Sequence, residues 1–595
     1  MVWPNMTEQQ IILFALFGAV FLCLLWGRFR YDMVAFSALI IGVIVGVVPT
    51  GSAFSGFGHP ATIIVALVLV VSSGLVRSGA VYLITNNFVK ASRSLSAHIA
   101  FMGFIGGILS AFMNNVAALA LLLPVDVQTA QKAKRAAGLS LMPLSFATIL
   151  GGMATLVGTP PNIIVSSFRE KALGEPFRMF DFAPVGVLVA FTGITFVALL
   201  GWKLIPKRDT QKLTSRDIDS YIAELTIPTK SALIGQRLAE LNEAALLSDV
   251  SIIGMIRDGK RLYGSPQSAV LKAQDALILE AVPNAVDEFR SNLNLDFSDE
   301  KREGMLRAEG EGLSLSEVIV TDRSRLHGKS VQSVGLAWRY GTILMGVSRN
   351  GKTILERLRK LVLLPGDILL LLSPKENAHT VIEWLNVLPL EDRGTQLTAN
   401  TKTTLAIFLF AAAILASAVG LIYLPIALGL LVVLYILFGI LALEGLYESI
   451  EWPIIVLLGS MIPLGLALEN SGGTALLAQV LLSLTQGQPN WVVLIILMIV
   501  TMTLSDVLNN TATTIVAAPV ALHLAKQLEV SPDPFLMAVA IAASAAFLTP
   551  IGHKNNTIIL GPGGYRFSDY WRMGLPLEIM IVAISIPALL LFWPL

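Results

Sequence analysis

Long apolar runs fill both ends of the chain, and a stretch rich in charged residues separates them. Many of these runs are long enough, or nearly so, to span a hydrocarbon core of about 30 Å as a helix. They include residues 11–27, 33–48, 63–75, 182–204, 404–421 and 426–443. The middle of the chain instead has short strand-like runs, at residues 250–256, 276–279, 343–347 and 368–372. The pattern predicts a polytopic α-helical membrane protein interrupted by soluble α+β structure.

A polar motif recurs inside the apolar sequence. Leu109-Ser110-x-x-x-Asn114-Asn115 is repeated 395 residues later as Leu504-Ser505-x-x-x-Asn509-Asn510, and each copy has a proline ten residues after its first asparagine. A buried amide must find partners in a membrane, so such a cluster is costly unless it has a use. The segment 75–79 also matches 468–472, at an offset of 393. The two membrane parts are therefore predicted to be a repeat with a substrate site at paired broken helices.

Each polar motif is predicted to be the tip of a re-entrant hairpin, over about Leu95–Ala130 and Leu476–Lys526. The helix that starts after the tip, from Ala117 or Ala512, would direct its positive end toward an anion. The carbonyls of the arm before the tip suit a hard cation such as sodium, together with the nearby serine hydroxyl. Because an asparagine side chain both donates and accepts, it can contact the two ligands at once.

Each half is also expected to contain a second broken helix. The first reads Thr155-x-x-Gly158-Thr159-Pro160-Pro161-Asn162 and the second Thr549-Pro550-Ile551-Gly552-x-x-Asn555-Asn556. Proline and glycine interrupt the backbone hydrogen bonds in mid-membrane and free carbonyls that can close a cation site. Asp506 is a further candidate for proton or cation binding. We assign no chemistry to His59, His98, His523 and His553.

Composition and charge refine this picture. Hydrophobic residues make up 54% of the chain and charged residues 14%, with a mean hydropathy of +0.72, as in polytopic membrane proteins. The net charge of +1 does not point to a nucleic-acid partner, and the single cysteine, Cys23, excludes a disulfide framework. The placement of lysines and arginines predicts that residues 208–403 are cytoplasmic and that the two halves are inverted. One loop, with Arg169, Lys171 and Arg178, disagrees.

The middle of the chain has a repeat of its own. Arg257-Asp258-Gly259-Lys260 recurs 92 residues later as Arg349-Asn350-Gly351-Lys352, and the segment 275–279 recurs as 367–371 at the same offset. This predicts two copies of one small α+β unit. The predicted domains are a first membrane repeat (1–207), a first soluble domain (208–300), a second soluble domain with its linker (301–403) and a second membrane repeat (404–595).

On these residues the membrane halves resemble the divalent anion/sodium symporter family. The Gly-Thr-Pro-Pro-Asn stretch of that family is intact at Gly158–Asn162, and its paired Ser-Asn-Thr tips correspond to residues 114–116 and 509–511. The resemblance implies an elevator-type homodimer with sodium as the coupling ion and no prosthetic group. It implies one sodium site around Ser110, Asn114, Asn115 and Gly158, and another around Ser505, Leu508, Asn510 and Leu548, with backbone carbonyls from the two leucines. It implies a dianion bound between the tips, for which the candidate residues are Asn114, Asn115, Val116, Asn509, Asn510, Thr511, Thr549 and Pro550.

The chain departs from the family pattern in three places. Asparagine replaces serine at both tips, Val116 replaces threonine, and Ile551-Gly552-His553-Lys554 replaces the expected Pro-Asn. The missing hydroxyl at Val116 argues against recognition of a second carboxylate. Lys554 would favour an oxyanion if it reached the pocket, but it is expected to face water. The middle segment resembles a tandem of the C-terminal domains of potassium-transport regulators (TrkA-C type), over about 213–298 and 305–390.

The resulting expectation is a sodium-coupled secondary transporter of a divalent oxyanion, and transporters with this insertion point to sulfate. A di- or tricarboxylate symporter is the alternative in the same class, and a regulated ion channel or a sodium/proton antiporter would be a different mechanism. The paired tips favour a closed, saturable site over a continuous pore. No nucleophile–base or paired-carboxylate motif of an enzyme occurs. We expect an integral protein of the cell membrane whose regulatory domains bind a small ligand, with a nucleotide as one candidate.

Overall fold

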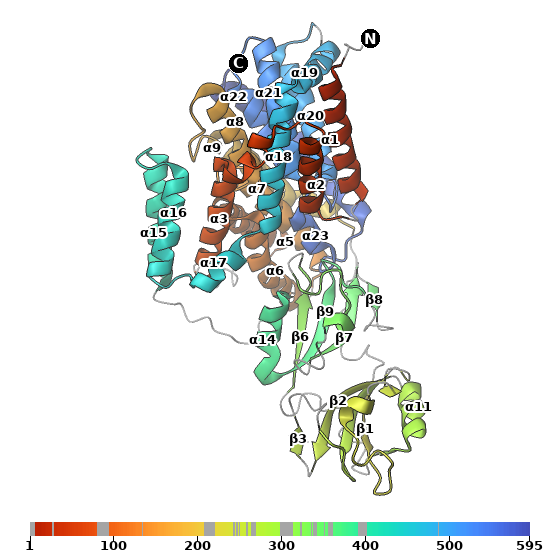
Figure 1. The fold of residues 1–595 in the computed structure, drawn as a ribbon. Helices are drawn as coiled ribbons and strands as arrows, with labels where there is room; N and C mark the ends of the chain where they lie inside the picture. Colours follow the sequence, from red (N-terminus) through yellow and green to blue (C-terminus); the bar gives the residue numbers. More distant parts are fainter. Residues whose placement is uncertain are drawn as a thin grey trace. The chain divides into compact units, whose positions relative to one another are not determined.

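The chain folds into two compact units (Figure 1). The first comprises Met1–Lys207, Gly394–Ile559 and Arg566–Leu595, and the second comprises Arg208–Arg393 and Leu560–Tyr565. The computed structural model describes residues 6–206 except 27–28, 80–93 and 134, and residues 402–595 except 486. It also describes residues 221–297 and 313–390, with short gaps. The predicted insert at 208–403 thus corresponds closely to the second unit.

The first unit is helical and apolar, as the sequence predicts. Five described segments have the length and composition to cross a membrane: 50–77, 95–112, 452–470, 490–507 and 567–592. The first half contains α1 (Glu8–Trp26), α2 (Tyr31–Ile44), α3 (Pro60–Arg77), α5 (Leu95–Phe112), α6 (Asn115–Lys132), α7 (Gly138–Gly152), α8 (Pro160–Leu173) and α9 (Ala183–Leu199). The second contains α15 (Lys402–Ala418), α16 (Leu424–Leu437), α17 (Leu443–Ser449), α18 (Trp452–Asn470), α19 (Gly473–Leu484), α20 (Asn490–Val507), α21 (Asn510–Gln527), α22 (Asp533–Ser544), α23 (Lys554–Leu560) and α24 (Tyr570–Phe592).

The two halves of this unit repeat one another helix by helix. Helices α5 and α6 begin and end 395 residues before α20 and α21, and α7 begins 395 residues before α22. Figure 1 shows the α5–α6 hairpin near the lower end of the unit and the α20–α21 hairpin near its upper end. This is the arrangement that an inverted repeat requires.

Close backbone contacts are repeated as well. A side chain at Gly186 of α9 would meet the carbonyl of Met153 at 2.3 Å, and one at Gly574 of α24 would meet the carbonyl of Phe547 at the same distance. Met153 and Phe547 both lie in the non-helical segments where α7 gives way to α8 and α22 to α23. Glycine therefore lets a neighbouring helix pack directly on each break.

Three predicted boundaries in this unit are wrong. The second hairpin begins at Asn490 and not near Leu476, because Leu476 lies in the separate helix α19. Gly487, with a φ of +76°, and Pro489 separate α19 from α20, although both helices are apolar. The helices after the tips begin at Asn115 and Asn510, two residues before the predicted Ala117 and Ala512. The asparagines are thus the first residues of these helices.

The second unit contains two five-stranded antiparallel sheets related by an offset of 92 residues. Their orders are β3-β2-β4-β1-β5 and β8-β7-β9-β6-β10, which are the same order in terms of equivalent strands. The strands of the first sheet are β1 (Tyr221–Thr226), β2 (Ser251–Arg257), β3 (Lys260–Leu262), β4 (Ala276–Ala281) and β5 (Asp296–Phe297), and α11 (Pro283–Leu293) accompanies them. The second sheet has β6 (Leu313–Ile319), β7 (Ile343–Arg349), β8 (Lys352–Ile354), β9 (Ile368–Pro374) and β10 (Leu388–Pro389), with α14 (Lys375–Leu385).

The two sheets have equivalent arginine–aspartate ion pairs. Arg257 contacts Asp275 through two hydrogen bonds of 2.8 and 2.7 Å, and Arg349 contacts Asp367 through two of 2.8 and 2.6 Å. The hydrogen bond to Asp367 raises the pKa of Arg349. In each repeated Arg-x-Gly-Lys motif the arginine is the last residue of one strand, and the lysine is the first residue of the next. The two residues between them, 258–259 and 350–351, lie outside the described residues.

Candidate functional site

The first asparagine of each pair caps the helix that follows it. Asn114 Oδ1 accepts a hydrogen bond of 2.9 Å from the Val116 N–H, and Asn509 Oδ1 accepts one of 2.8 Å from the Thr511 N–H. Such a cap stabilises a helix start whose first N–H groups have no partner within the helix. In both predicted substrate residues the cap uses one lone pair of the side-chain oxygen, and the amide NH₂ can still donate to an anion.

The second asparagine of the first tip is buried in a polar cluster. Asn115 is 4% exposed, and its Oδ1 lies 2.6 Å from the Ser110 hydroxyl. A side chain on Gly152 would meet Asn115 Oδ1 at 2.5 Å, and one on Gly158 would meet the Gly152 carbonyl at 2.3 Å. Three of the four residues of the first predicted sodium site, Ser110, Asn115 and Gly158, thus come together around Gly152.

The broken helix of the second half contacts the tip of the first hairpin. Asn555 Nδ2 donates to the Asn115 carbonyl at 3.1 Å and to the Thr148 hydroxyl at 2.8 Å. Asn556 Oδ1 accepts from the Ser145 hydroxyl at 2.9 Å, so α23 is anchored on α7. In the other direction, α8 packs on α21 and α22. Each broken helix therefore supports the hairpin of the other half.

His553 contacts Asn115 directly, which the sequence analysis missed. Its Nε2 lies 3.3 Å from the Asn115 side-chain amide, and its Nδ1 accepts a hydrogen bond of 3.2 Å from the Asn555 N–H. Asn115 Oδ1 accepts from the Ser110 hydroxyl, so the imidazole lies at the other end of the amide, next to its NH₂. Ser110 and His553 therefore contact the two ends of the tip amide.

In each half a threonine of the second broken helix contacts the hairpin of the same half. The Thr549 hydroxyl donates to the Asp506 carbonyl at 2.6 Å, and the Thr155 hydroxyl donates to the equivalent carbonyl, that of Ala111. A side chain on Gly552 would meet the Ser505 carbonyl at 2.8 Å. The break of each second helix is thus held to the end of its own hairpin arm by a threonine.

Buried carboxyl groups shape the second predicted sodium site. Asp506 Oδ1 accepts a hydrogen bond of 2.9 Å from the Leu548 N–H, and Glu578 Oε1 accepts one of 3.2 Å from the Phe547 N–H. Asp506 and Glu578 are 3% and 8% exposed. They position the backbone at Leu548, whose carbonyl is a predicted ligand. Glu578 was not among the predicted site residues.

The remaining predicted residues of the second tip lie in or next to the hairpin. Leu508 is buried at the end of α20, and Ser505 donates to the Ala543 carbonyl. Asn510 Oδ1 accepts from the Thr511 N–H at 2.8 Å and lies 3.3 Å from the Thr511 hydroxyl. Pro550 is buried, and its carbonyl accepts from the Thr557 hydroxyl at 2.6 Å.

Lys554 does not face water alone, contrary to the sequence-based expectation. Its Nζ lies 2.8 Å from Glu451 Oε2 and 3.3 Å from the Tyr31 hydroxyl, and its side chain is 27% exposed. Glu451 Oε1 lies 3.4 Å from Asn114 Nδ2. The carboxylate of Glu451 therefore links this lysine to the first tip. Glu451 directly precedes α18 in an unremarkable stretch of sequence, so no motif indicated it.

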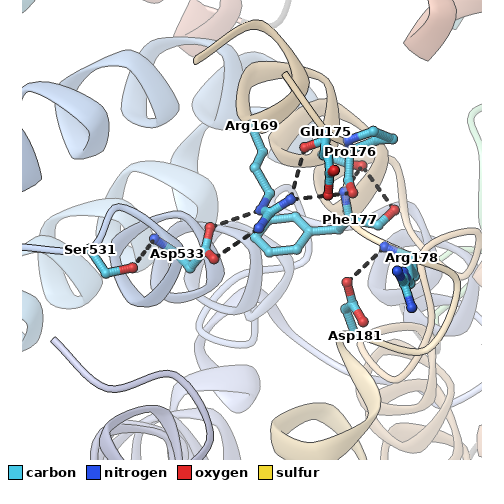
Figure 2. A network of polar contacts seen from close by, with 9 residues as sticks. Arg169, Glu175, Pro176, Phe177, Arg178, Asp181, Ser531 and Asp533 are labelled. Atoms are coloured by element: carbon cyan, nitrogen blue, oxygen red, sulfur yellow. Dashed lines mark hydrogen bonds and ion pairs between the residues drawn. The ribbon is translucent and has the colours of Figure 1, made fainter. Parts of the chain in front are cut away.

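The loop whose charges disagreed with the predicted topology is held by ion pairs (Figure 2). Arg169 of α8 makes two hydrogen bonds of 2.8 and 3.1 Å to Asp533 of α22, and also donates to the Glu175 carbonyl. Lys171 pairs with Glu469 at 3.1 Å. These ion pairs join α8 to α22 and α18, and the disagreement with the positive-inside pattern stands.

The oxygen atoms gathered here suit a monovalent cation. In the described residues no group of three or more His, Cys, Asp and Glu side chains could hold a metal ion. Hydroxyl, amide and carbonyl oxygens, as at Ser110 and Asn115, are ligands for a hard cation of low charge.

Comparison with known proteins places the chain in a family. The sequence pattern of the citrate transporter family matches residues 21–523 and 477–595. An uncharacterized transporter of Synechocystis sp. is 31% identical over 573 residues, which are 94% of this chain and 93% of that protein. A sodium/sulfate cotransporter of Chlamydomonas reinhardtii is 27% identical over 55% of this chain and 38% of its own length. A sodium-dependent high-affinity dicarboxylate transporter of Caenorhabditis elegans is 26% identical over 24% of this chain and 25% of its own. With both halves of its helical repeat matched, the chain belongs to the citrate transporter family.

Proposed function

We propose that this protein is a sodium-coupled secondary transporter of a divalent oxyanion, with sulfate as its preferred substrate. The difference between the two tips supports this choice. Thr511 at the second tip carries a hydroxyl next to Asn510, whereas the equivalent residue of the first tip is Val116. A compact tetrahedral anion can take its hydrogen bonds mainly from one tip. A dicarboxylate has two separated charged groups, and each needs its own donors.

The neutral oxygens around the hairpins support sodium as the coupling ion. Ser110, Asn115 and Gly158 converge in the first half, and the Ser505 carbonyl lies against Gly552 in the second. Similarity to a sodium/sulfate cotransporter agrees with both the cation and the anion.

A di- or tricarboxylate symporter is the second candidate. The description of the matched family and the similarity to a dicarboxylate transporter favour it. A regulated channel has less support, because paired hairpin tips make a closed, saturable site. A sodium/proton antiporter has less support, because the sodium-dependent proteins similar to this chain carry anions.

Uptake into proteoliposomes tests the proposal. Purified protein should accumulate radiolabelled sulfate when sodium is higher outside, and uptake should saturate and be competed by other tetrahedral oxyanions. Accumulation of succinate or citrate in place of sulfate would support the second candidate. Sulfate uptake that persists after the sodium gradient is collapsed would refute sodium coupling.

We further propose a role and a location for the second unit. Residues 208–403 are cytoplasmic domains of the TrkA-C type that regulate transport, with a small ligand such as a nucleotide bound there. The membrane halves form a homodimer in the cell membrane and move by an elevator mechanism. Cross-linking of the detergent-solubilised protein, with a dimer as the expected species, tests the assembly.

A further inference from the structure

Lys554 is a cation placed beside the first hairpin tip. It follows His553, whose ring contacts Asn115, and its Nζ lies 2.8 Å from a carboxylate oxygen of Glu451. The other oxygen of that carboxylate lies 3.4 Å from Asn114 Nδ2. The lysine is therefore tied to both tip asparagines, to one through a carboxylate and to the other through its chain neighbour.

The fold itself does not require a lysine at this position. The equivalent residue of the first half is Pro160, which begins α8 just as Lys554 begins α23. Proline suits the first position of a helix, whereas a positive side chain there is opposed by the helix dipole. The positive charge thus exists in one half only and is unfavourable for the local structure, which points to another use.

The two charges of the ion pair would act on a bound anion in opposite ways. The side chain of Glu451 is 9% exposed, so water screens its negative charge poorly. A dianion near Asn114 would be repelled by Glu451 and attracted by Lys554. The carboxylate keeps the ammonium close to the tip in the absence of substrate and competes with the substrate for it.

We propose that Lys554 recognises the transported anion and that Glu451 restrains this lysine, so that the pair sets the affinity for the anion. This inference rests on the proposed function, in which an anion binds at the hairpin tips. It makes Lys554 and Glu451 residues that determine the affinity for the anion.

Opposite effects of the two partners distinguish this role from a purely structural ion pair. In sodium-driven uptake, Lys554→Gln should raise the KM for the anion about tenfold or more, because a charge-assisted contact is lost. Glu451→Gln should lower the KM, because the competing carboxylate is gone. Lys554→Arg should retain most of the affinity. A structural ion pair would instead make Lys554→Gln and Glu451→Gln impair uptake alike, and this result would overturn the proposal.

The ion pair at the other end of α18 provides the matched control. Lys171 and Glu469 also join a broken helix to α18, at 3.1 Å, and Glu469 lies about 27 Å along the helix from Glu451. Lys171→Gln and Glu469→Gln should leave the KM unchanged. A rise comparable to that of Lys554→Gln would show that any such pair affects affinity, and would overturn the proposal.

The assay separates this inference from the proposed function. It uses whichever of sulfate and succinate the wild-type protein transports, at equal amounts of folded protein as judged by size-exclusion chromatography. Wild-type transport with an unchanged KM in Lys554→Gln refutes the inference alone, whereas failure of the wild type to transport either anion refutes both. If Lys554→Gln does not fold, the KM of Glu451→Gln decides, since a gain in affinity cannot result from misfolding.

Discussion

Gly552 and His553 are neighbours in the chain but contact different hairpins. A side chain on Gly552 would lie 2.8 Å from the Ser505 carbonyl of the second hairpin, whereas the ring of His553 lies 3.3 Å from the Asn115 amide of the first. Consecutive Cα atoms are only about 3.8 Å apart. The arm of one hairpin and the tip of the other therefore meet at this dipeptide.

Replacing His553 should disturb the first cation site. His553→Leu removes the polar partner of the Asn115 NH₂, so the sodium concentration for half-maximal uptake should rise about tenfold. His553→Gln can still accept a hydrogen bond and should have a smaller effect. His523→Leu is the control, because His523 lies 13 residues beyond Asn510 in α21 and about 20 Å from the tip. Equal sodium dependence in His553→Leu and the wild type would contradict the positioning role.

The tip asparagines themselves should be essential. Asn115→Ala and Asn510→Ala each remove an amide from the proposed site, and a buried partner left unpaired costs about 1–3 kcal/mol, or about tenfold or more in binding. Each variant should abolish uptake while still folding and inserting. The control Asn470→Ala changes an exposed asparagine at the end of α18 and should transport normally. Near-normal uptake by either tip variant at equal surface amount would show that the site is elsewhere.

Some of this site could be predicted from the sequence, because its elements are local and repeated. The motif offset of 395 residues is also the offset of the helices on both sides of each tip. The contact between His553 and Asn115 joins residues 438 positions apart, and no local pattern indicates it. Glu451 and Glu578 were missed for the same reason. The helix starts were misplaced because the asparagines cap their own helices, and apolar composition alone did not separate α19 from α20.

The residue after the first tip should influence substrate choice. Val116→Thr adds the hydroxyl that Thr511 provides at the second tip, and with it a hydrogen-bond donor for a second anionic group. The variant should still transport sulfate and should improve any weak succinate uptake. The measurement is the ratio of kcat/KM for the two anions. The isosteric exchange in the opposite direction, Thr511→Val, should reduce transport of both anions. An unchanged kcat/KM ratio in Val116→Thr would remove Val116 from the argument for sulfate.

The second unit should control the rate of transport without forming the substrate site. Its two sheets repeat at an offset of 92 residues, and the helical repeat is complete on either side of it. A ligand bound to this unit can change transport only if it binds two transporter states with different affinity. Replacing residues 208–393 by a flexible glycine–serine linker should therefore preserve sodium-coupled uptake and its KM but change its maximal rate.

The location of this unit can be tested with a single cysteine. Ala273→Cys places a thiol at an exposed position between β3 and β4, in a Cys23→Ala background that removes the native thiol. In intact cells an impermeant maleimide should leave this cysteine unlabelled, and permeabilisation should expose it. Labelling from outside would overturn the predicted topology.

The linker variant gives an independent test of the second unit. Loss of anion binding in a well-folded linker variant would show, whatever the topology, that the second unit helps to build the site.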